Sequence, residues 1–476
     1  MLTTAKQTKI VCTIGPASHD VAILKKMIQA GMNVARLNFS HGTHADHAKL
    51  IKTVRAAAAK VGEPVATLQD LSGPKMRVGD LPEKGIELKA NQEVDVAFGK
   101  AYDGKVIPVS YPYIHTDIRP GEQVLLDDGL MELRALRVNG KVLRCKVVVG
   151  GTLLSHKGFN VPTSKLRIDT ITAKDKDDVL FGLRQGVDWV SLSFVRSADD
   201  IRNLKSLIKR AKKGGLMPKI LAKIEKKEAL DDLENIVKEV DGIMIARGDL
   251  AIETKAEEVP VRQKEIIEMC LRYGRPVIVA TEMMASMAKN PRPTRAELSD
   301  VGHAVMDHAD AVMTSGETAT GAYPVLTVDT MAKIAQSTEK SVFDDYPLEL
   351  HAKHRHTRDR IVGITARLLV EQTKAAVIGF LPGNESIARL ASHFRTPVPL
   401  VVGVKTAREA QQLNLWWGLH GVVVSGRTVA EFQKQLLGWM REYGIRAGAT
   451  VAFLSAQYRP EDARFSLQVE EKTILK

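Results

Sequence analysis

The chain has 476 residues, of which 44% are hydrophobic and 26% are charged, as is typical of a globular protein with about two to four domains. No apolar run has the length of a transmembrane helix, and the strand-like TKIVCTIG begins so early that we expect no secretory signal. Cys12, Cys145 and Cys270 form no CxxC pair, so we expect reduced thiols in the cytoplasm, without a disulfide framework or a zinc site.

The formal net charge of +12 would by itself suit a polyanionic partner. Residues 351–476 hold 18 Lys and Arg against 10 Asp and Glu, whereas the first 350 residues hold 50 against 46. The basic excess is therefore concentrated towards the C-terminal end, without the Arg-Gly repeats or aromatic-basic interleaving typical of RNA-binding proteins. We expect a small phosphorylated ligand, or no specific polyanion, rather than a nucleic acid.

Strand-like and helix-like runs alternate through the first 73 residues. The runs TKIVCTIG, NVARLNF and PVATLQDL predict strands, and the amphipathic runs between them predict helices. From residue 74 to residue 165 the pattern changes to short strands and turns, with Asn139-Gly140 as a strong hairpin signal. This segment predicts a separate all-β domain.

The alternation of strands and helices resumes after residue 165. Five further strand-like runs follow: VDWVSLSFV, KILAKIE, GIMIARGDL, PVIVATEM and AVMTSGET. Together with the first three they give the eight strands and eight helices of a (β/α)8 TIM barrel. We therefore expect an α/β fold in which residues 1–73 and 166–345 form the barrel, residues 74–165 an inserted β-barrel domain, and residues 346–476 a C-terminal αβ domain.

The segment HAKHRHTRDR, which joins the barrel to the C-terminal domain, contains His351, His354 and His356. These histidines could bind a metal, but no carboxylate or thiol at ligand spacing accompanies them. We interpret the segment as a solvated linker.

The reactive groups of a (β/α)8 barrel lie at the carboxyl ends of its strands, and here those ends are rich in polar residues. They carry Arg36, Asn38, Ser40, His41, Asp70, Lys223, Glu225, Arg247, Gly248, Asp249, Thr281, Glu282, Ser315 and Glu317. Lys223 and Glu225 are two residues apart in a strand, so both point into the mouth of the barrel. Carboxylates beside Lys and Arg suit a site for Mg²⁺ and phosphate. Any one of these charges alone could form a structural salt bridge, but their occurrence at so many strand ends together favours function.

Two uncharged residues at these strand ends have a functional and a plain interpretation. Gly248 lets the backbone approach a ligand, and the amides around it can bind an anion such as a carboxylate, but glycine is also an ordinary turn residue. The hydroxyl of Thr281 can hold a carboxylate or a water, or Thr281 can simply end a strand. Spacing alone leaves both choices open.

Eight motifs stand in order along the chain: TKIVCTIGPAS, NVARLNFSHG, DLSGPKMR, KIEKKEAL, IARGDL, ATEMMASM, NPRPTRAE and TSGETATGAYP. Together they resemble the pyruvate kinase family, from about residue 7 to residue 340 and more faintly to the end. The resemblance implies a cytoplasmic, allosteric homotetramer that catalyses the last step of glycolysis. That reaction transfers the phosphoryl group of phosphoenolpyruvate to ADP, giving pyruvate and ATP, and depends on Mg²⁺ or Mn²⁺.

The resemblance also implies roles for the charged residues at the strand ends. Glu225 and Asp249 correspond to the Mg²⁺ ligands. Lys223 corresponds to the cation that stabilises the moving phosphoryl group and the enolate, and Arg36 to the phosphate-binding arginine.

Further roles follow from the same resemblance. Gly248, Asp249 and Thr281 resemble the cradle of the substrate carboxylate, and Ser315 resembles a member of the relay that protonates the enolate. His41, Arg77 and Lys157 resemble the residues that contact the nucleotide phosphates. The inserted β domain, hinged at Gly73-Pro74, resembles a lid that excludes water, which would otherwise compete for the phosphoryl group.

Lys75 stands where many family members carry glutamate. The members with glutamate need K⁺, which is bound by the counterparts of Asn38, Ser40 and Asp70, whereas members with lysine resemble K⁺-independent enzymes. A fixed positive charge beside Asp70 should lower the affinity of the site for another monovalent cation. We therefore expect that K⁺ is not required.

The chain departs from the family pattern at other positions. Glu282 replaces the usual glutamine and can perturb the pKa of its neighbours, and Ala251 replaces a usual glycine, but neither change is expected to abolish activity. The C-terminal domain is the part least similar to the family pattern, because LPGNESIARLASHF stands in place of the usual effector loop. Ser386 and Arg389 are candidates for binding a phosphorylated effector, and a helix cap is the competing interpretation of Ser386.

Two other functions are compatible with part of the pattern. A Mg²⁺-dependent lyase acting on enolates uses the same barrel with Glu, Asp and Arg, but needs neither Lys223 beside Glu225 nor an inserted lid. A non-catalytic relative that binds nucleic acid or protein would account for the basic C-terminal end, but every catalytic position is filled.

Overall fold

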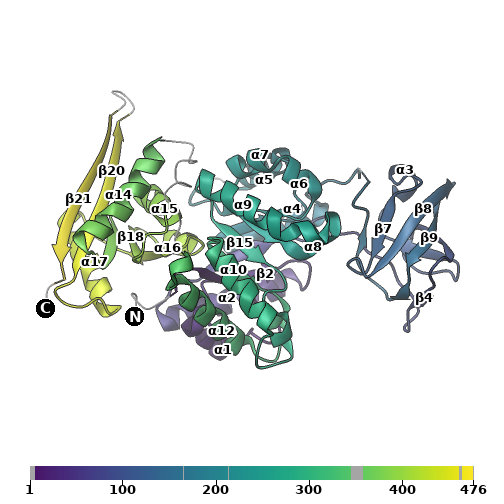
Figure 1. Ribbon diagram of the computed structural model, residues 1–476, viewed down its shortest axis with the longest axis horizontal. Coiled ribbons are helices and arrows are strands. Elements are labelled where there is room, and N and C mark those ends of the chain that lie inside the picture. The colour runs from purple at the N-terminus through teal and green to yellow at the C-terminus, as the bar shows by residue number, and fades with distance from the viewer. Residues whose placement is uncertain (1–5, 165, 213, 345–356, 460–463, 475–476) are drawn as a thin grey trace.

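The structure is a computed structural model that describes residues 6–164, 166–212, 214–344, 357–459 and 464–474. Figure 1 shows the β domain at one end of the molecule, the barrel in the middle and the C-terminal domain at the other end. The linker histidines His351, His354 and His356 lie outside the described residues. Among the described residues, no helix is long and apolar enough to cross a membrane.

Eight parallel strands close into a barrel in the order β1-β16-β15-β14-β13-β12-β3-β2, which confirms the predicted (β/α)8 fold. The strands are β1 (Lys9–Thr13), β2 (Val34–Asn38), β3 (Ala66–Asp70), β12 (Trp189–Leu192), β13 (Lys219–Ile224), β14 (Gly242–Ala246), β15 (Val277–Ala280) and β16 (Ala311–Thr314). The register aligns polar strand ends, because Asn38 lies opposite Asp70 and Asp70 lies opposite Ser191. Site residues far apart in the sequence therefore share one layer at the mouth of the barrel.

Helices surround the barrel: α1 (Val21–Ala30), α2 (His44–Val61), α4 (Ala173–Gln185), α5 (Ala198–Ala211), α6 (Lys227–Asp231), α7 (Leu233–Glu239), α8 (Arg247–Glu253), α9 (Val259–Tyr273), α10 (Arg295–Met306), α11 (Gly316–Ala319) and α12 (Pro324–Glu339), with 3-10 turns η2 (Ala256–Glu258), η3 (Ala285–Ala288) and η4 (Val342–Asp344). Capping boxes at Thr43 and Thr172 begin α2 and α4, because each threonine and the aspartate three residues later satisfy one another's backbone donors. KEALDDLENIVKEV predicts one helix, but the chain forms α6 and α7 with a break at Asp232.

The inserted domain comprises β4 (Ile86–Leu88), β5 (Glu93–Phe98), β6 (Val106–Val109), α3 (Ile114–Asp117), β7 (Gln123–Leu126), β8 (Met131–Asn139), β9 (Val142–Val149), β10 (Gly151–Leu153) and β11 (Phe159–Asn160). Its main sheet has the order β11-β7-β8-β9-β5-β6. Asn139 pairs with Val142, and Gly140 has a φ of 61°, so the predicted hairpin is confirmed. A separate apolar cluster that includes Val96, Leu133 and Phe159 gives this domain its own core.

The C-terminal domain comprises α14 (Thr357–Thr373), β17 (Val377–Phe380), α15 (Glu385–His393), β18 (Leu400–Val404), α16 (Ala407–Leu413), β19 (Leu419–Val423), α17 (Val429–Glu442), β20 (Thr450–Arg459) and β21 (Arg464–Thr473). Its sheet has the order β19-β18-β17-β20-β21, with β20 and β21 as a long antiparallel pair (Figure 1). The last strand, β21, is an addition to the predicted elements.

The C-terminal domain closes the end of the barrel at which the strands begin. One apolar cluster runs from the barrel interior into the C-terminal domain, and the rings of Trp189 and Trp416 lie 5.4 Å apart within it. Polar contacts cross the same boundary: Lys9 Nζ donates to the carbonyl of Leu419 at 2.7 Å, and Arg395 pairs with buried Asp310 at 3.0 Å. The opposite end of the barrel, which carries the strand-end polar residues, faces the β domain.

Candidate active site

Lys223 and Glu225 form the centre of the site. Lys223 lies in β13, and Glu225 is the first residue after this strand. Because side chains alternate along a strand, both point to the same side. Lys223 Nζ lies 2.9 Å from Glu225 Oε1 and 3.6 Å from Asp70 Oδ1, and donates to Ser193 Oγ at 2.9 Å. Glu225 is fully buried. The ammonium is therefore held by groups from three strand ends.

Arg36 and Asp70 form a second buried pair beside this centre. The guanidinium contacts Asp70 Oδ2 through Nη2 at 2.6 Å and through Nε at 2.8 Å. Its Nη1 donates to Thr13 Oγ1 at 2.8 Å. Because β1, β2 and β3 are neighbours in the barrel, these contacts fix the guanidinium at the mouth.

The charges of the site determine its protonation states. Burial disfavours the charged form of Lys223, but Asp70 and Glu225 outweigh it and raise the pKa of the ammonium. Burial likewise opposes the Asp70 carboxylate, but Lys223 and Arg36 lower its pKa below the usual range. Burial raises the pKa of Glu225, with nearby Asp249 adding to the effect and Lys223 opposing it. An additional cation near Glu225 would therefore favour the ionised form of this carboxylate.

The residues present fit a hard divalent cation. Glu225 and Asp249 are carboxylates, and each already attracts an ammonium, since Lys223 contacts Glu225 and Lys75 Nζ lies 3.3 Å from Asp249 Oδ1. Among the described residues, no group of three or more His, Cys, Asp or Glu is arranged to hold a metal alone. One or two carboxylates completed by substrate oxygens are the usual protein ligands of Mg²⁺.

The run GIMIARGDL predicted that Gly248 and Asp249 end a strand. Both residues instead lie in the first turn of α8. The amide of Gly248 donates to Thr281 Oγ1 at 2.9 Å. Thr281 and Glu282 both have a left-handed backbone, with φ of 71° and 57°, and Glu282 is exposed. Ala251 lies inside α8, where alanine is favoured. The structure thus brings Gly248 and Thr281 together as one polar group.

Ser315 lies at the end of β16 and precedes the short helix α11. Its amide donates to Glu317 Oε2 at 2.7 Å, and Glu317 Oε1 accepts the amide of Met284 at 3.2 Å. Glu317 is buried and thereby links the ends of β15 and β16. No hydrogen bond of the Ser315 hydroxyl is seen among the described residues.

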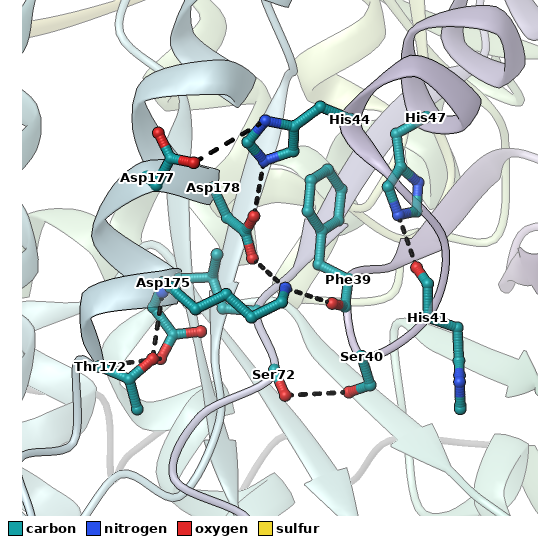
Figure 2. A network of polar contacts seen from close by, with 12 residues as sticks. Phe39, Ser40, His41, His44, His47, Ser72, Thr172, Asp175, Asp177 and Asp178 are labelled. Carbon is teal, nitrogen blue, oxygen red and sulfur yellow. Dashed lines mark hydrogen bonds and ion pairs between the residues drawn. The ribbon is translucent and has the colours of Figure 1, made fainter.

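A cavity of about 570 Å³ adjoins the ends of β1 and β2, and its lining includes Thr13, Asn38, His41 and Lys49. The Asn38 side chain accepts the amide of Ser40 at 3.1 Å, which shapes the loop leading to His41. Figure 2 shows that the imidazole of His41 points away from the neighbouring network of polar contacts.

The other two residues expected at the nucleotide lie in the β domain. Arg77 donates to the carbonyl of His156 at 2.9 Å, and Lys157 pairs with Asp127 at 2.9 Å. As far as the chain is described, neither has a polar contact with the barrel site. The structure therefore brings the barrel residues together but holds Arg77 and Lys157 apart from them.

Ser386 and Arg389 lie on α15, near the boundary with the barrel. The guanidinium carbon of Arg389 lies 5.3 Å from the centre of the Trp416 ring, and burial lowers the pKa of this arginine. Ser386 is exposed. The N-cap of α15 is Asn384, so the competing interpretation of Ser386 as the helix cap is wrong.

The supporting contacts of Arg247 and Phe194 escaped the sequence analysis. Arg247 was noticed only as a strand-end charge, but it pairs with Asp300 at 2.6 Å and donates to the carbonyl of Thr281 at 2.8 Å. The amide of Phe194 donates to Glu225 Oε2 at 2.7 Å. A backbone N–H donor cannot be predicted from residue type. The arginine next to Gly-Asp, in contrast, was a usable signal for a side chain that supports the site.

The comparisons with known proteins agree with this geometry. The family model "Pyruvate kinase, barrel domain" matches residues 5–328. The chain is 43% identical to "Pyruvate kinase 2" of Synechocystis sp. over 424 residues, which cover 88% of this chain and 71% of the relative. It is 42% identical to a pyruvate kinase of Agrobacterium vitis over 87% of each chain. A pyruvate kinase of Clostridium acetobutylicum is 37% identical, over 88% of this chain and 89% of the relative. From its barrel, its strand-end charges and these relatives, the chain belongs to the pyruvate kinase family of phosphotransferases.

Proposed function

We propose that this enzyme transfers the phosphoryl group of phosphoenolpyruvate to ADP, giving pyruvate and ATP in glycolysis. The observation that carries the proposal is the position of Lys223 Nζ, held between Glu225 at 2.9 Å and Asp70 at 3.6 Å beside buried Arg36. Phosphoryl transfer needs charge neutralisation and alignment more than covalent assistance. A fixed ammonium and a fixed guanidinium meet that need, because both substrates are polyanions.

Each cation has its own task in this reaction. Arg36 binds the phosphoryl group of phosphoenolpyruvate and is held rigidly for this by Asp70 and Thr13. Lys223, kept protonated by its two carboxylate neighbours, stabilises charge on the moving phosphoryl group and on the enolate that it leaves. Rigid placement matters because preorganised charges need no rearrangement during the reaction.

Glu225 and Asp249 would hold the Mg²⁺, or Mn²⁺, that the family generally uses. When bound, the ion would neutralise phosphate charge and orient the two substrates. Gly248 and Thr281 receive the substrate carboxylate. Because the Gly248 amide donates to Thr281 Oγ1, the hydroxyl proton of Thr281 is left to donate to the incoming carboxylate. Ser315 takes part in delivering the proton to the enolate.

The lid completes the site from the other side. His41 of the barrel, with Arg77 and Lys157 of the β domain, contacts the phosphates of ADP. Lys157 and Arg77 make their present contacts within the lid, so this role requires the lid to move about the hinge at Gly73 and Pro74. Closure excludes water, which would otherwise accept the phosphoryl group.

The remaining parts of the proposal follow from the family resemblance. K⁺ is not required, because Lys75 supplies a fixed cation close to the site. The enzyme is a cytoplasmic homotetramer, and a phosphorylated effector binds the C-terminal domain near Ser386 and Arg389.

A coupled assay of the purified enzyme tests the central reaction. Pyruvate should form only when phosphoenolpyruvate, ADP and a divalent cation are all present. Lys223→Met should lower kcat by about 10²- to 10³-fold while the protein keeps its fold and its Mn²⁺ binding. Cleavage of a hydroxy-acid thioester without ADP, or a near-normal kcat in the variant, would count against the proposal.

A further inference from the structure

The start of helix α4 contacts the loop of residues 39–43, which joins β2 to α2 and carries His41. Lys174 Nζ donates to the carbonyl of Phe39 at 2.7 Å and to Asp178 Oδ2 at 2.6 Å. The other oxygen of Asp178 accepts His44 Nε2 at 2.7 Å. Figure 2 shows His44 at the far end of the same loop, with contacts to both Asp177 and Asp178. One buried carboxylate therefore holds both ends of the loop, directly through His44 and through Lys174.

The side chains of this network are packed against buried rings. Asp178 is 2% exposed, and the ring of His44 stacks on Phe181 with centroids 4.4 Å apart. Phe39 is buried and stacks on His47 at 3.9 Å. His47 Nε2 in turn lies 2.9 Å from the carbonyl of His41. The loop is thus fixed by groups on both sides of His41, while the His41 side chain stays free of the network (Figure 2).

The same turn of α4 also holds the hinge of the lid. Asp175 is fully buried, and its Oδ1 accepts the amide of Gly73 at 3.1 Å. Its Oδ2 accepts the amide of Thr172 at 2.9 Å, so the segment that leaves for the lid is tied to the segment that returns from it. The loop and the hinge consequently share one support.

Lys174 contributes more to the position of the loop than to the core. Its side chain is 54% exposed, so its removal opens no buried cavity. Its two hydrogen bonds connect a buried carboxylate to one backbone carbonyl, two residues before His41. A charge-assisted hydrogen bond of this kind is directional and strong.

We propose that Lys174 and Asp178 are positioning residues for the nucleotide, which hold the loop of residues 39–43 so that His41 faces the cavity beside β1 and β2. This rests on the proposed function, in which His41 contacts the phosphates of ADP. Loss of the network should weaken ADP binding more than phosphoenolpyruvate binding, since Arg36 and Lys223 are held by other contacts.

Steady-state kinetics and equilibrium ADP binding on the full chain test the proposal. Lys174→Met should raise the KM and the Kd for ADP by roughly tenfold, as loss of one charge-assisted hydrogen bond predicts, with a much smaller change in the KM for phosphoenolpyruvate. Lys174→Arg keeps both contacts and should restore ADP affinity to within about threefold of the wild type. Lys333→Met is the matched control, because Lys333 also pairs with an aspartate one helical turn away, on α12, and is 73% exposed.

The outcomes separate this role from a structural one and from failure of the proposed function. An unchanged ADP affinity in Lys174→Met, or equal losses for both substrates together with a lower Tm, would overturn the positioning role. If the wild type binds ADP but forms no pyruvate, the proposed reaction fails while the Kd values still decide the role of Lys174. Asp178→Asn should reproduce the ADP defect, and Lys174→Met decides the matter if that variant does not fold.

Discussion

The ammonium of Lys75 lies 3.3 Å from the carboxylate of Asp249, while Asp70 is occupied by Arg36 and Lys223. Lys75 follows the hinge at the start of the lid and Asp249 lies in the first turn of α8. One ion pair therefore connects the lid segment to a carboxylate proposed to hold Mg²⁺. The sequence analysis placed the charge of Lys75 beside Asp70. In the structure this charge is close to the site, but it pairs with Asp249 instead.

The first prediction concerns monovalent cations. In buffer without K⁺ or Na⁺, the rate should be close to that measured with K⁺, because Lys75 supplies a positive charge permanently. Lys75→Glu removes this charge and should make the enzyme slower without K⁺ by about tenfold or more. A large stimulation of the wild type by K⁺ would contradict the assignment of Lys75.

The second prediction concerns the divalent cation. Glu225→Gln should weaken Mn²⁺ binding by at least about tenfold. Loss of a residue that only hydrogen-bonds to a metal ligand already lowers metal affinity by roughly 10- to 100-fold. Titration of the enzyme with Mn²⁺, followed by electron paramagnetic resonance without substrates, measures this directly. Glu228→Gln, an exposed glutamate three residues further on, should bind Mn²⁺ like the wild type; equal affinities in all three proteins would remove Glu225 from the metal site.

The third prediction concerns stability at the site. Asp70→Asn leaves Arg36 and Lys223 as buried cations without their shared carboxylate, and removal of one partner of a buried pair costs about 3–5 kcal/mol. The free energy of unfolding, from denaturant curves followed by tryptophan fluorescence, should fall accordingly. Asp95→Asn breaks the partly exposed pair with Arg144 and should cost only about 0–1 kcal/mol. Similar losses in the two variants would contradict the structural importance of Asp70.

The fourth prediction concerns pH. Burial lowers the pKa of Lys9 from 10.5 to about 7, and Lys6 adds to the effect. Between these values the unfolded chain holds a proton that the folded chain does not, so stability rises with pH. Lys9→Met lacks this contribution. The free energy of unfolding of the variant minus that of the wild type should therefore decrease as pH rises from 7 to 10. Thermal unfolding of both proteins across this range measures the difference, and a constant difference would argue against a neutral Lys9 in the folded protein.

The fifth prediction concerns the hinge. Gly73 has a φ of 65°, and a Cβ there would lie 2.8 Å from the ring of Phe194 and 3.0 Å from the Cβ of Ser193. These neighbours hold Glu225 and Lys223, so Gly73→Ala should lower both the free energy of unfolding and kcat. Gly140 has a similar φ of 61° but open space around it, so Gly140→Ala should cost only the backbone strain of about 1–2 kcal/mol and leave kcat unchanged. Equal behaviour of the two variants would show that the crowding at Gly73 does not matter.

The sequence predicted the barrel because its strands are short buried runs separated by amphipathic helices. Lys223 and Glu225 could be placed together because two residues in a strand fix a common direction. Asp70 and Asn38 could be placed near them because parallel strands end in one layer.

Contacts that cross between segments were less accessible to sequence reasoning. The pairing of Lys75 with Asp249 depends on the direction in which the chain leaves the barrel for the lid, and the hydrogen bond from Arg247 to the carbonyl of Thr281 involves a backbone atom. Strand β21 was missed although RFSLQVEEKT begins with alternating apolar residues, since that segment lies outside the regular alternation of strands and helices.

The hydrogen bond between Lys9 and the carbonyl of Leu419 joins residues 410 positions apart. Domains of a growing chain generally fold in order of synthesis, but here the first strand of the barrel is covered by a segment that is synthesised much later. Until that segment arrives, the starting end of the barrel, with Trp189 inside it, has no cover from Trp416. The nascent barrel should therefore be a client for chaperones until the segment with Trp416 and Leu419 has been synthesised.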